Sequence, residues 1–72
     1  MEVKRSYYEY PPYFAAINPH KGQGPVYFKV VLRHEGSGII EVKEEFVDAG
    51  KAKAYLATKY GLLLAEWKDQ SS

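Results

Sequence analysis

The sequence predicts an α+β domain in which one face of an antiparallel sheet packs against a single helix. The sheet is expected to have three strands, and the sequence leaves undecided whether a fourth is present. Three patterns predict this class. Residues 26–34 alternate between apolar and polar side chains with the period of a strand. Residues 39–47 resume a β-rich run after a glycine-containing turn. Residues 49–60 carry apolar side chains at helical spacing, so the predicted order is β-β-α-β.

The segment before these elements, residues 7–14, holds four of the seven tyrosines and two of the four prolines. Consecutive prolines lack a backbone N–H and disfavour helix, so we expect an extended aromatic arm. Residues 15–17 could add one short strand, and residues 18–25 have the composition of a loop. Whether the arm covers the sheet face opposite the helix, or presents its rings to a partner, stays open.

Residues 26–47 predict a β-hairpin. On the first arm, Phe28, Val30 and Leu32 share one face, and the turn contains Gly36 and Gly38. Glu44 interrupts the apolar face of the second arm. The strand either bulges there or leaves the sheet, and the pattern is compatible with both.

The predicted helix spans residues 49–60 because Asp48 is a suitable N-cap and Gly61 a suitable left-handed stop. Residues 62–68 then predict a last strand. A right-handed crossover would place this strand beside the apolar first arm of the hairpin. The expected strand order is therefore second arm, first arm, final strand. The helical stripe expected to be buried is Ala49, Ala52, Leu56 and Tyr60.

Composition limits the classes of protein. Seventy-two residues make one domain, in which we expect residues 1–6 and 69–72 to be flexible ends. The absence of cysteine excludes disulfides, thiolate zinc sites and cysteine nucleophiles. The longest apolar run is far shorter than the roughly 20 residues that span a membrane. We expect a cytoplasmic monomer.

Nothing in the sequence favours catalysis, a cofactor or a metal. The glycines of Gly22-Gln23-Gly24 precede a proline and a strand, whereas a phosphate cradle needs a helix N-terminus. His20 and His34 lie on different turns and have no cysteine to complete a ligand set. The serines lie in the tails or in a turn, without triad spacing. The sequence therefore predicts a binding protein rather than an enzyme.

Two surfaces are candidates for partner binding. The first is the aromatic arm, where rigid tyrosines would anchor a partner and neighbouring cations would steer it: Lys4, Arg5, Tyr7, Tyr8, Tyr10 and Tyr13. The second is a helix face on which one ring is flanked by two cations: Lys51, Tyr55 and Lys59.

A protein is the favoured partner. Aromatic anchors in a chain of net charge +1 describe the core of a protein interface better than a groove that follows a nucleic-acid backbone. The alternative is a single-stranded nucleic acid, because tyrosines can stack on bases and lysines and arginines are scattered along the chain.

In size, cysteine-free composition and β-β-α-β order with an aromatic, proline-containing arm, the chain resembles the small proteins that phages use to seize host machinery. Examples are transcription inhibitors that bind RNA polymerase, and anti-CRISPR proteins. The resemblance covers general organisation and carries over no functional residue. It implies a viral, stoichiometric inhibitor or regulator of transcription or of other nucleic-acid machinery, with a host complex such as RNA polymerase as its partner.

Overall fold

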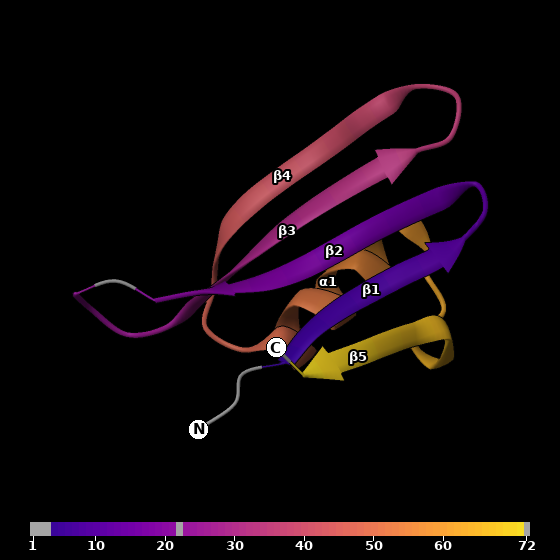
Figure 1. Ribbon diagram of the computed structural model, residues 1–72. Helices are drawn as coiled ribbons and strands as arrows, with labels where there is room; N and C mark the ends of the chain where they lie inside the picture. Colours follow the sequence, from indigo (N-terminus) through magenta and orange to yellow (C-terminus); the bar gives the residue numbers. More distant parts are fainter. Residues whose placement is uncertain (1–3, 22, 72) are drawn as a thin grey trace.

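The computed structural model describes residues 4–21 and 23–71, which form one antiparallel sheet with one helix packed on it (Figure 1). The strand order is β4-β3-β2-β1-β5. Along the chain the elements are β1 (Lys4–Tyr10), β2 (Tyr13–His20), β3 (Tyr27–His34), β4 (Gly38–Phe46), α1 (Ala49–Tyr60), the short 3-10 helix η1 (Leu64–Glu66) and β5 (Trp67–Ser71).

Helix α1 has the bounds that the sequence predicts. The Asp48 side chain accepts hydrogen bonds from the backbone N–H groups of Gly50 (2.6 Å) and Lys51 (3.4 Å), so it caps the first turn. Gly61 ends the helix in the left-handed region, with φ of 74°. Of the predicted buried stripe, Ala52 and Leu56 are completely buried, whereas Ala49 and Tyr60 are partly buried against the core.

The predicted hairpin of residues 26–47 is confirmed as β3 and β4. Val30 pairs with Lys43, whereas Phe28 pairs with Phe46, so β4 holds one extra residue in this interval. The interruption at Glu44 is therefore a bulge within the strand rather than an exit from the sheet. A second shift in register follows Leu32 on β3.

The predicted strand number and order are wrong, because the tyrosine-rich segment is not an arm. It forms the hairpin of β1 and β2, with Pro11 and Pro12 at the turn, where no ladder N–H is required (Figure 1). Tyr10 pairs with Tyr13 across this turn. The hairpin inserts between β3 and β5, which the prediction had placed side by side.

Three boundaries also differ from prediction. The additional short strand considered at residues 15–17 is present as the middle of β2. However, β2 continues through Pro19 to His20, inside the predicted loop. Among the described residues, the pairing of β1 with β2 runs from Ile17 to Tyr13, so Pro19 lies beyond it and pairs with Phe28 on β3. A proline, which has no backbone N–H, is tolerated where one side of a strand is unpaired. Residues 4–6 and 69–71, predicted as flexible ends, lie in β1 and β5. Residues 1–3 and 72 lie outside the described part of the chain.

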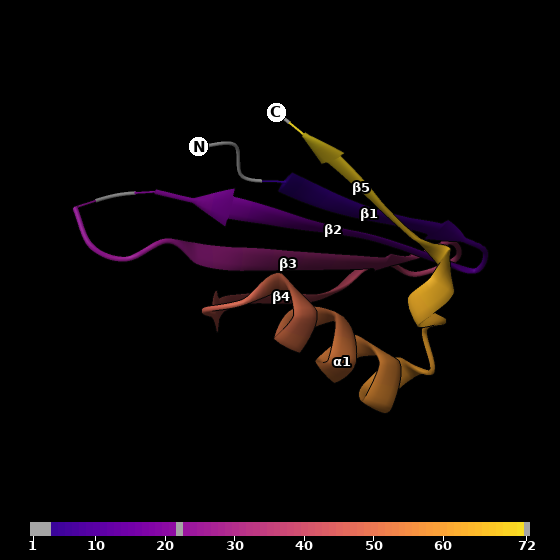
Figure 2. The ribbon, with the colours of Figure 1, turned by 90° about the horizontal axis from the view of Figure 1, so that it is seen from below.

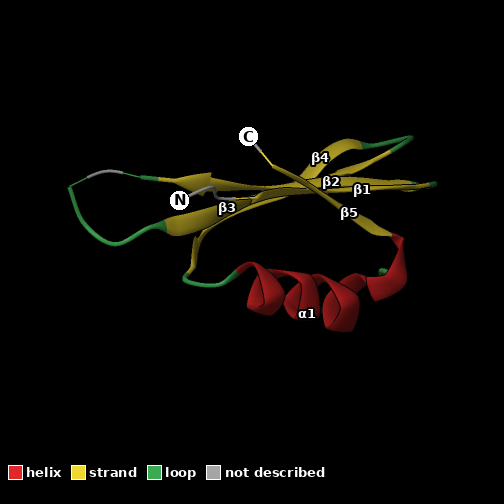
Figure 3. Cartoon of the chain, turned by 60° about the horizontal axis from the view of Figure 1, so that its bottom comes forward, coloured by secondary structure: helices red, strands yellow, loops and turns green. Residues whose placement is uncertain are grey.

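The last predicted strand, residues 62–68, begins five residues late. Leu62 is buried, Leu63 and Leu64 are exposed, and η1 leads into β5 at Trp67. The chain needs this turn to return from the helix layer to the sheet edge (Figure 3). Leu62 and Trp67 are separated by an odd number of positions and both reach the core, so residues 62–68 are not the continuous strand that was predicted.

The core lies in the single space between α1 and the sheet (Figure 2). The sheet contributes side chains from β1, β2, β3 and β5, and the helix contributes Ala52 and Leu56. The buried apolar residues are Tyr8, Ala15, Ile17, Val30, Leu32, Ala52, Leu56, Leu62 and Trp67. One core layer between one helix and one sheet leaves the opposite sheet face without a partner from the described residues.

Candidate functional site

The sheet face that points away from α1 is not covered by any described element (Figures 2 and 3). Strand alternation assigns its side chains, because Tyr8, Ile17 and Val30 point into the core and their neighbours point the other way. We call this surface the open face. Its residues are Arg5, Tyr7, Glu9, Phe14, Ala16, Asn18, His20, Tyr27, Lys29, Val31, Arg33, Ile39, Val42, Glu44, Lys68 and Gln70.

Apolar side chains occupy the middle of the open face in register. Tyr7 is paired with Ala16, Ala16 with Val31, and Val31 with Val42, so one row crosses four strands. Val42 is 51% exposed and Ile39, in the next row, 63% exposed. Tyr7, Ala16 and Val31 are half-buried, so the row is most exposed at its β4 end. Apolar side chains left uncovered together on a small domain are typical of a contact site.

A shallow hollow of about 450 Å³ lies over this row. The small side chain of Ala16 leaves the space, and Tyr7, Phe14, Val31 and Arg33 are among the residues that line it. The hollow is therefore bordered by two aromatic rings from neighbouring strands and by one guanidinium.

Cationic side chains surround the apolar middle. Both arginines of the chain, Arg5 and Arg33, lie on this face and are exposed, as is Lys68. The Arg33 guanidinium lies 5.2 Å from the centroid of the Phe14 ring. Lys29 forms an ion pair with Glu44, with 3.4 Å between Nζ and Oε1.

The predicted tyrosine surface is divided between two sides of the sheet. Tyr7 lies half-buried on the open face, whereas Tyr8 is buried under α1, where its hydroxyl accepts a hydrogen bond from the Leu63 N–H at 3.2 Å. The ring of Tyr10 contacts that of Tyr8 and is 48% exposed. The ring of Tyr13 packs against that of Tyr60 on α1. Because neighbouring strand residues point to opposite faces, these rings cannot form one strip. Of the two predicted steering cations, Arg5 lies on the open face, and Lys4 lies in β1.

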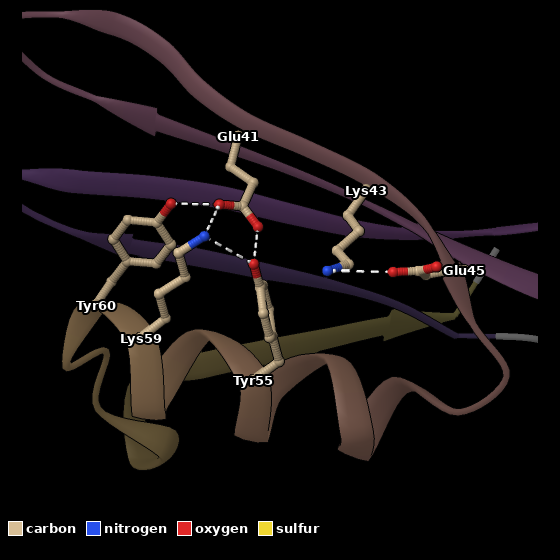
Figure 4. A network of polar contacts seen from close by, with 6 residues as sticks. All are labelled: Glu41, Lys43, Glu45, Tyr55, Lys59 and Tyr60. Atoms are coloured by element: carbon tan, nitrogen blue, oxygen red, sulfur yellow. Dashed lines mark hydrogen bonds and ion pairs between the residues drawn. The ribbon is translucent and has the colours of Figure 1, made fainter.

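The second predicted surface also differs from expectation. Tyr55 is half-buried and donates its hydroxyl hydrogen bond to Glu41 on β4 (Figure 4). Lys59 binds the same carboxylate, with 2.8 Å between Nζ and Oε1, and Tyr60 donates a third hydrogen bond. Lys51 is exposed. Two of the three predicted residues thus have partners within the molecule.

The charges and hydroxyls around Glu41 are those of a structural contact between β4 and α1. The Lys59 ammonium, followed by the hydroxyls of Tyr55 and Tyr60, lowers the pKa of Glu41 from an ordinary value of 4.5 to about 2. The Glu41 carboxylate in turn raises the pKa of Lys59. A carboxylate with such a low pKa is a weak proton acceptor at neutral pH. We therefore interpret the cluster as a tie between β4 and α1.

Sequence reasoning missed most residues of the open face, including Phe14, Ala16 and Val42. The available signal was the alternation of Arg5, Ser6, Tyr7 and Tyr8, which is compatible with a strand once the prolines are assigned to a turn. The aromatic composition of the segment concealed that alternation.

Fold and surface together define a class: a small α+β protein whose sheet has one face packed on a helix and one face exposed. A scan against protein-family models and searches of curated proteins and of solved structures found no match to this chain. Among residues 4–21 and 23–71, no helix is long and apolar enough to cross a membrane. Within the same ranges, no group of three or more His, Asp or Glu side chains could hold a metal ion.

Proposed function

We propose that this protein is a non-enzymatic binding module that acts by occupying a macromolecular partner with its open face. The observation that carries the proposal is the uncovered row of Tyr7, Ala16, Val31 and Val42, surrounded by charged side chains. An apolar centre within a polar rim is the usual anatomy of a recognition surface.

A partner could also bind by pairing a strand of its own with an edge of the sheet, but both edges disfavour this mode. The edge strand β4 contains two shifts in register and carries Lys43, Glu44 and Glu45. The other edge, β5, has only five residues, which include Lys68 and Asp69. Bulges, charges and short length all discourage pairing with a further strand. A partner is therefore more easily accommodated on the face than along an edge.

The side chains with acid-base potential support a function without catalysis. Glu41 is engaged by three donors and has a pKa near 2. Of the histidines, His20 is stacked on Tyr27 and His34 accepts a hydrogen bond from the Gly36 N–H at 3.1 Å. Regulation of a host complex such as RNA polymerase is one use of such a module, and only the resemblance to phage inhibitors supports that partner.

Affinity capture tests the assignment of the surface. Tagged protein would capture its partner from a lysate of the cells in which it occurs, with and without nuclease treatment. Ile39→Glu and Val42→Glu place a charge on the open face at its β4 edge, at side chains already 63% and 51% exposed. We expect both variants to lose the partner while keeping the thermal unfolding midpoint of the parent protein.

Leu64→Glu is the matched control, because Leu64 is 59% exposed in η1, on the helix side of the sheet (Figure 3). It should retain the partner. If Leu64→Glu abolished capture and the two open-face variants did not, the binding surface would lie on the helix side and the proposal would be wrong.

A further inference from the structure

We propose that the partner of the open face is a single strand of nucleic acid, whose bases stack on Tyr7 and Phe14 and whose phosphates lie against Arg5, Arg33 and Lys68. This inference rests on the proposed function and names the chemistry of the partner.

The two rings have the placement that stacking requires. Tyr7 is opposite Ala16, and Phe14 precedes Ala16 by two residues on the same face, so the rings are diagonal neighbours on adjacent strands. Diagonal neighbours in a sheet are roughly 7 to 8 Å apart, a span that successive bases of an unstacked strand can bridge. The hollow over Ala16 supplies the space between them.

The charge of the open face favours nucleic acid over a second copy of this chain as its partner. Among the described residues, the open face has four cationic side chains (Arg5, Lys29, Arg33, Lys68) and two acidic ones (Glu9, Glu44), a net charge of +2. The whole chain carries only +1, so folding concentrates positive charge on this side. Two such faces packed against each other would repel, whereas a phosphate backbone would be attracted.

The cations also lie on both sides of the rings. Lys68 and Arg5 belong to β5 and β1, and Arg33 to β3 beyond the ring of Phe14. A strand that crosses the rings would therefore meet a cation before and after its stacked bases. A duplex hides the faces of its bases, so this arrangement favours an unpaired strand.

Fluorescence anisotropy with a labelled 20-nucleotide oligothymidylate tests the inference, with a duplex of equal length measured in parallel. We expect the single strand to bind more tightly. Lys29 is already paired with Glu44, which leaves three cations for phosphates. A slope of about −0.7 per phosphate contact then predicts that affinity falls roughly 20-fold between about 50 and 200 mM salt.

Two matched pairs of variants locate the site. Arg33→Gln should weaken binding and reduce the salt slope by about 0.7, whereas Lys51→Gln, the loss of one exposed cation from α1, should change neither. Tyr7→Val should weaken binding by about 5-fold or more through lost stacking, whereas Tyr10→Val, on the same strand but outside the open face, should not.

Several outcomes would overturn the inference. These are no binding of the single strand at about 50 mM salt, equal affinity for the duplex, or equal losses in Lys51→Gln and Arg33→Gln. If oligonucleotides fail to bind while Val42→Glu still abolishes nuclease-resistant capture, the open face binds a protein and only the nucleic-acid inference is wrong. A dimer detected by sedimentation and abolished by Val42→Glu would instead identify a second copy as the occupant.

Discussion

Glu41 shows how one side chain can connect an edge strand to the helix. Its side chain is 13% exposed, and its carboxylate accepts hydrogen bonds from the Lys59 ammonium at 2.8 Å and from the hydroxyls of Tyr55 and Tyr60 (Figure 4). Hydrogen bonds to a charged acceptor contribute more than neutral ones, although the half-exposed ammonium weakens its share through solvent screening.

Glu41→Gln should therefore destabilise the protein by about 1 to 2 kcal/mol at neutral pH in a urea titration. Glu45→Gln is the control, because Glu45 pairs with Lys43 at 3.1 Å but its side chain is 71% exposed. The control should cost less than about 0.5 kcal/mol. Equal losses in the two variants would contradict a specific role for Glu41.

The low pKa of Glu41 also determines how the stabilisation that it contributes changes with pH. Since folding lowers this pKa from 4.5 to about 2, the stabilisation is complete above about pH 4.5 and is lost as pH falls from about 4.5 toward 2. The difference in unfolding free energy between parent and Glu41→Gln should shrink through this window. A difference that stays constant from pH 7 to pH 2 would exclude ionisation as its source.

At the scale of elements, α1 owes its bounds to local signals. Asp48 supplies the cap, and Gly61 supplies a conformation with φ of 74° that L side chains rarely adopt. A Cβ added at Gly61 would meet no atom within 4 Å, so any cost of adding one comes from the backbone alone.

Gly61→Ala should thus cost about 1 to 2 kcal/mol, measured by thermal or urea unfolding. Gly24→Ala is a matched control, because a Cβ at Gly24 also meets nothing within 4 Å and no positive φ is recorded there. The control should be neutral or slightly stabilising. A loss in Gly61→Ala no larger than in Gly24→Ala would refute the backbone argument.

At the scale of the whole molecule, stability depends on one core layer between the helix and the sheet. Leu56 is completely buried in that layer, whereas Leu64 is 59% exposed. Leu56→Ala should cost about 2 to 5 kcal/mol, and Leu64→Ala less than about 1 kcal/mol, by chemical denaturation. A change below about 1 kcal/mol for Leu56→Ala would place that side chain outside the core.

The sequence predicted α1 and the β3–β4 hairpin because each depends on neighbours along the chain. Caps act within one helical turn, and strand alternation acts within a few residues. The sequence also predicted an uncovered face made of Tyr27, Val31, Ile39, Leu62 and Leu64. The first three do lie on the open face, but Leu62 is buried in the core and Leu64 lies in η1. The predicted cover was wrong, because the segment between Tyr7 and Phe14 contains both the end of one strand and the start of another.

Only the tertiary structure decided where that hairpin lies. Pairing of β1 with β5 joins residues 59 to 67 positions apart, and no local pattern specifies such a contact. The same pairing sends Tyr8 into the core and Tyr7 outward, and it aligns Arg5 with Gln70 on the open face. Composition determined that the chain has rings and cations, whereas strand register determined which of them meet, because each step of one residue along a strand exchanges the two faces of a sheet.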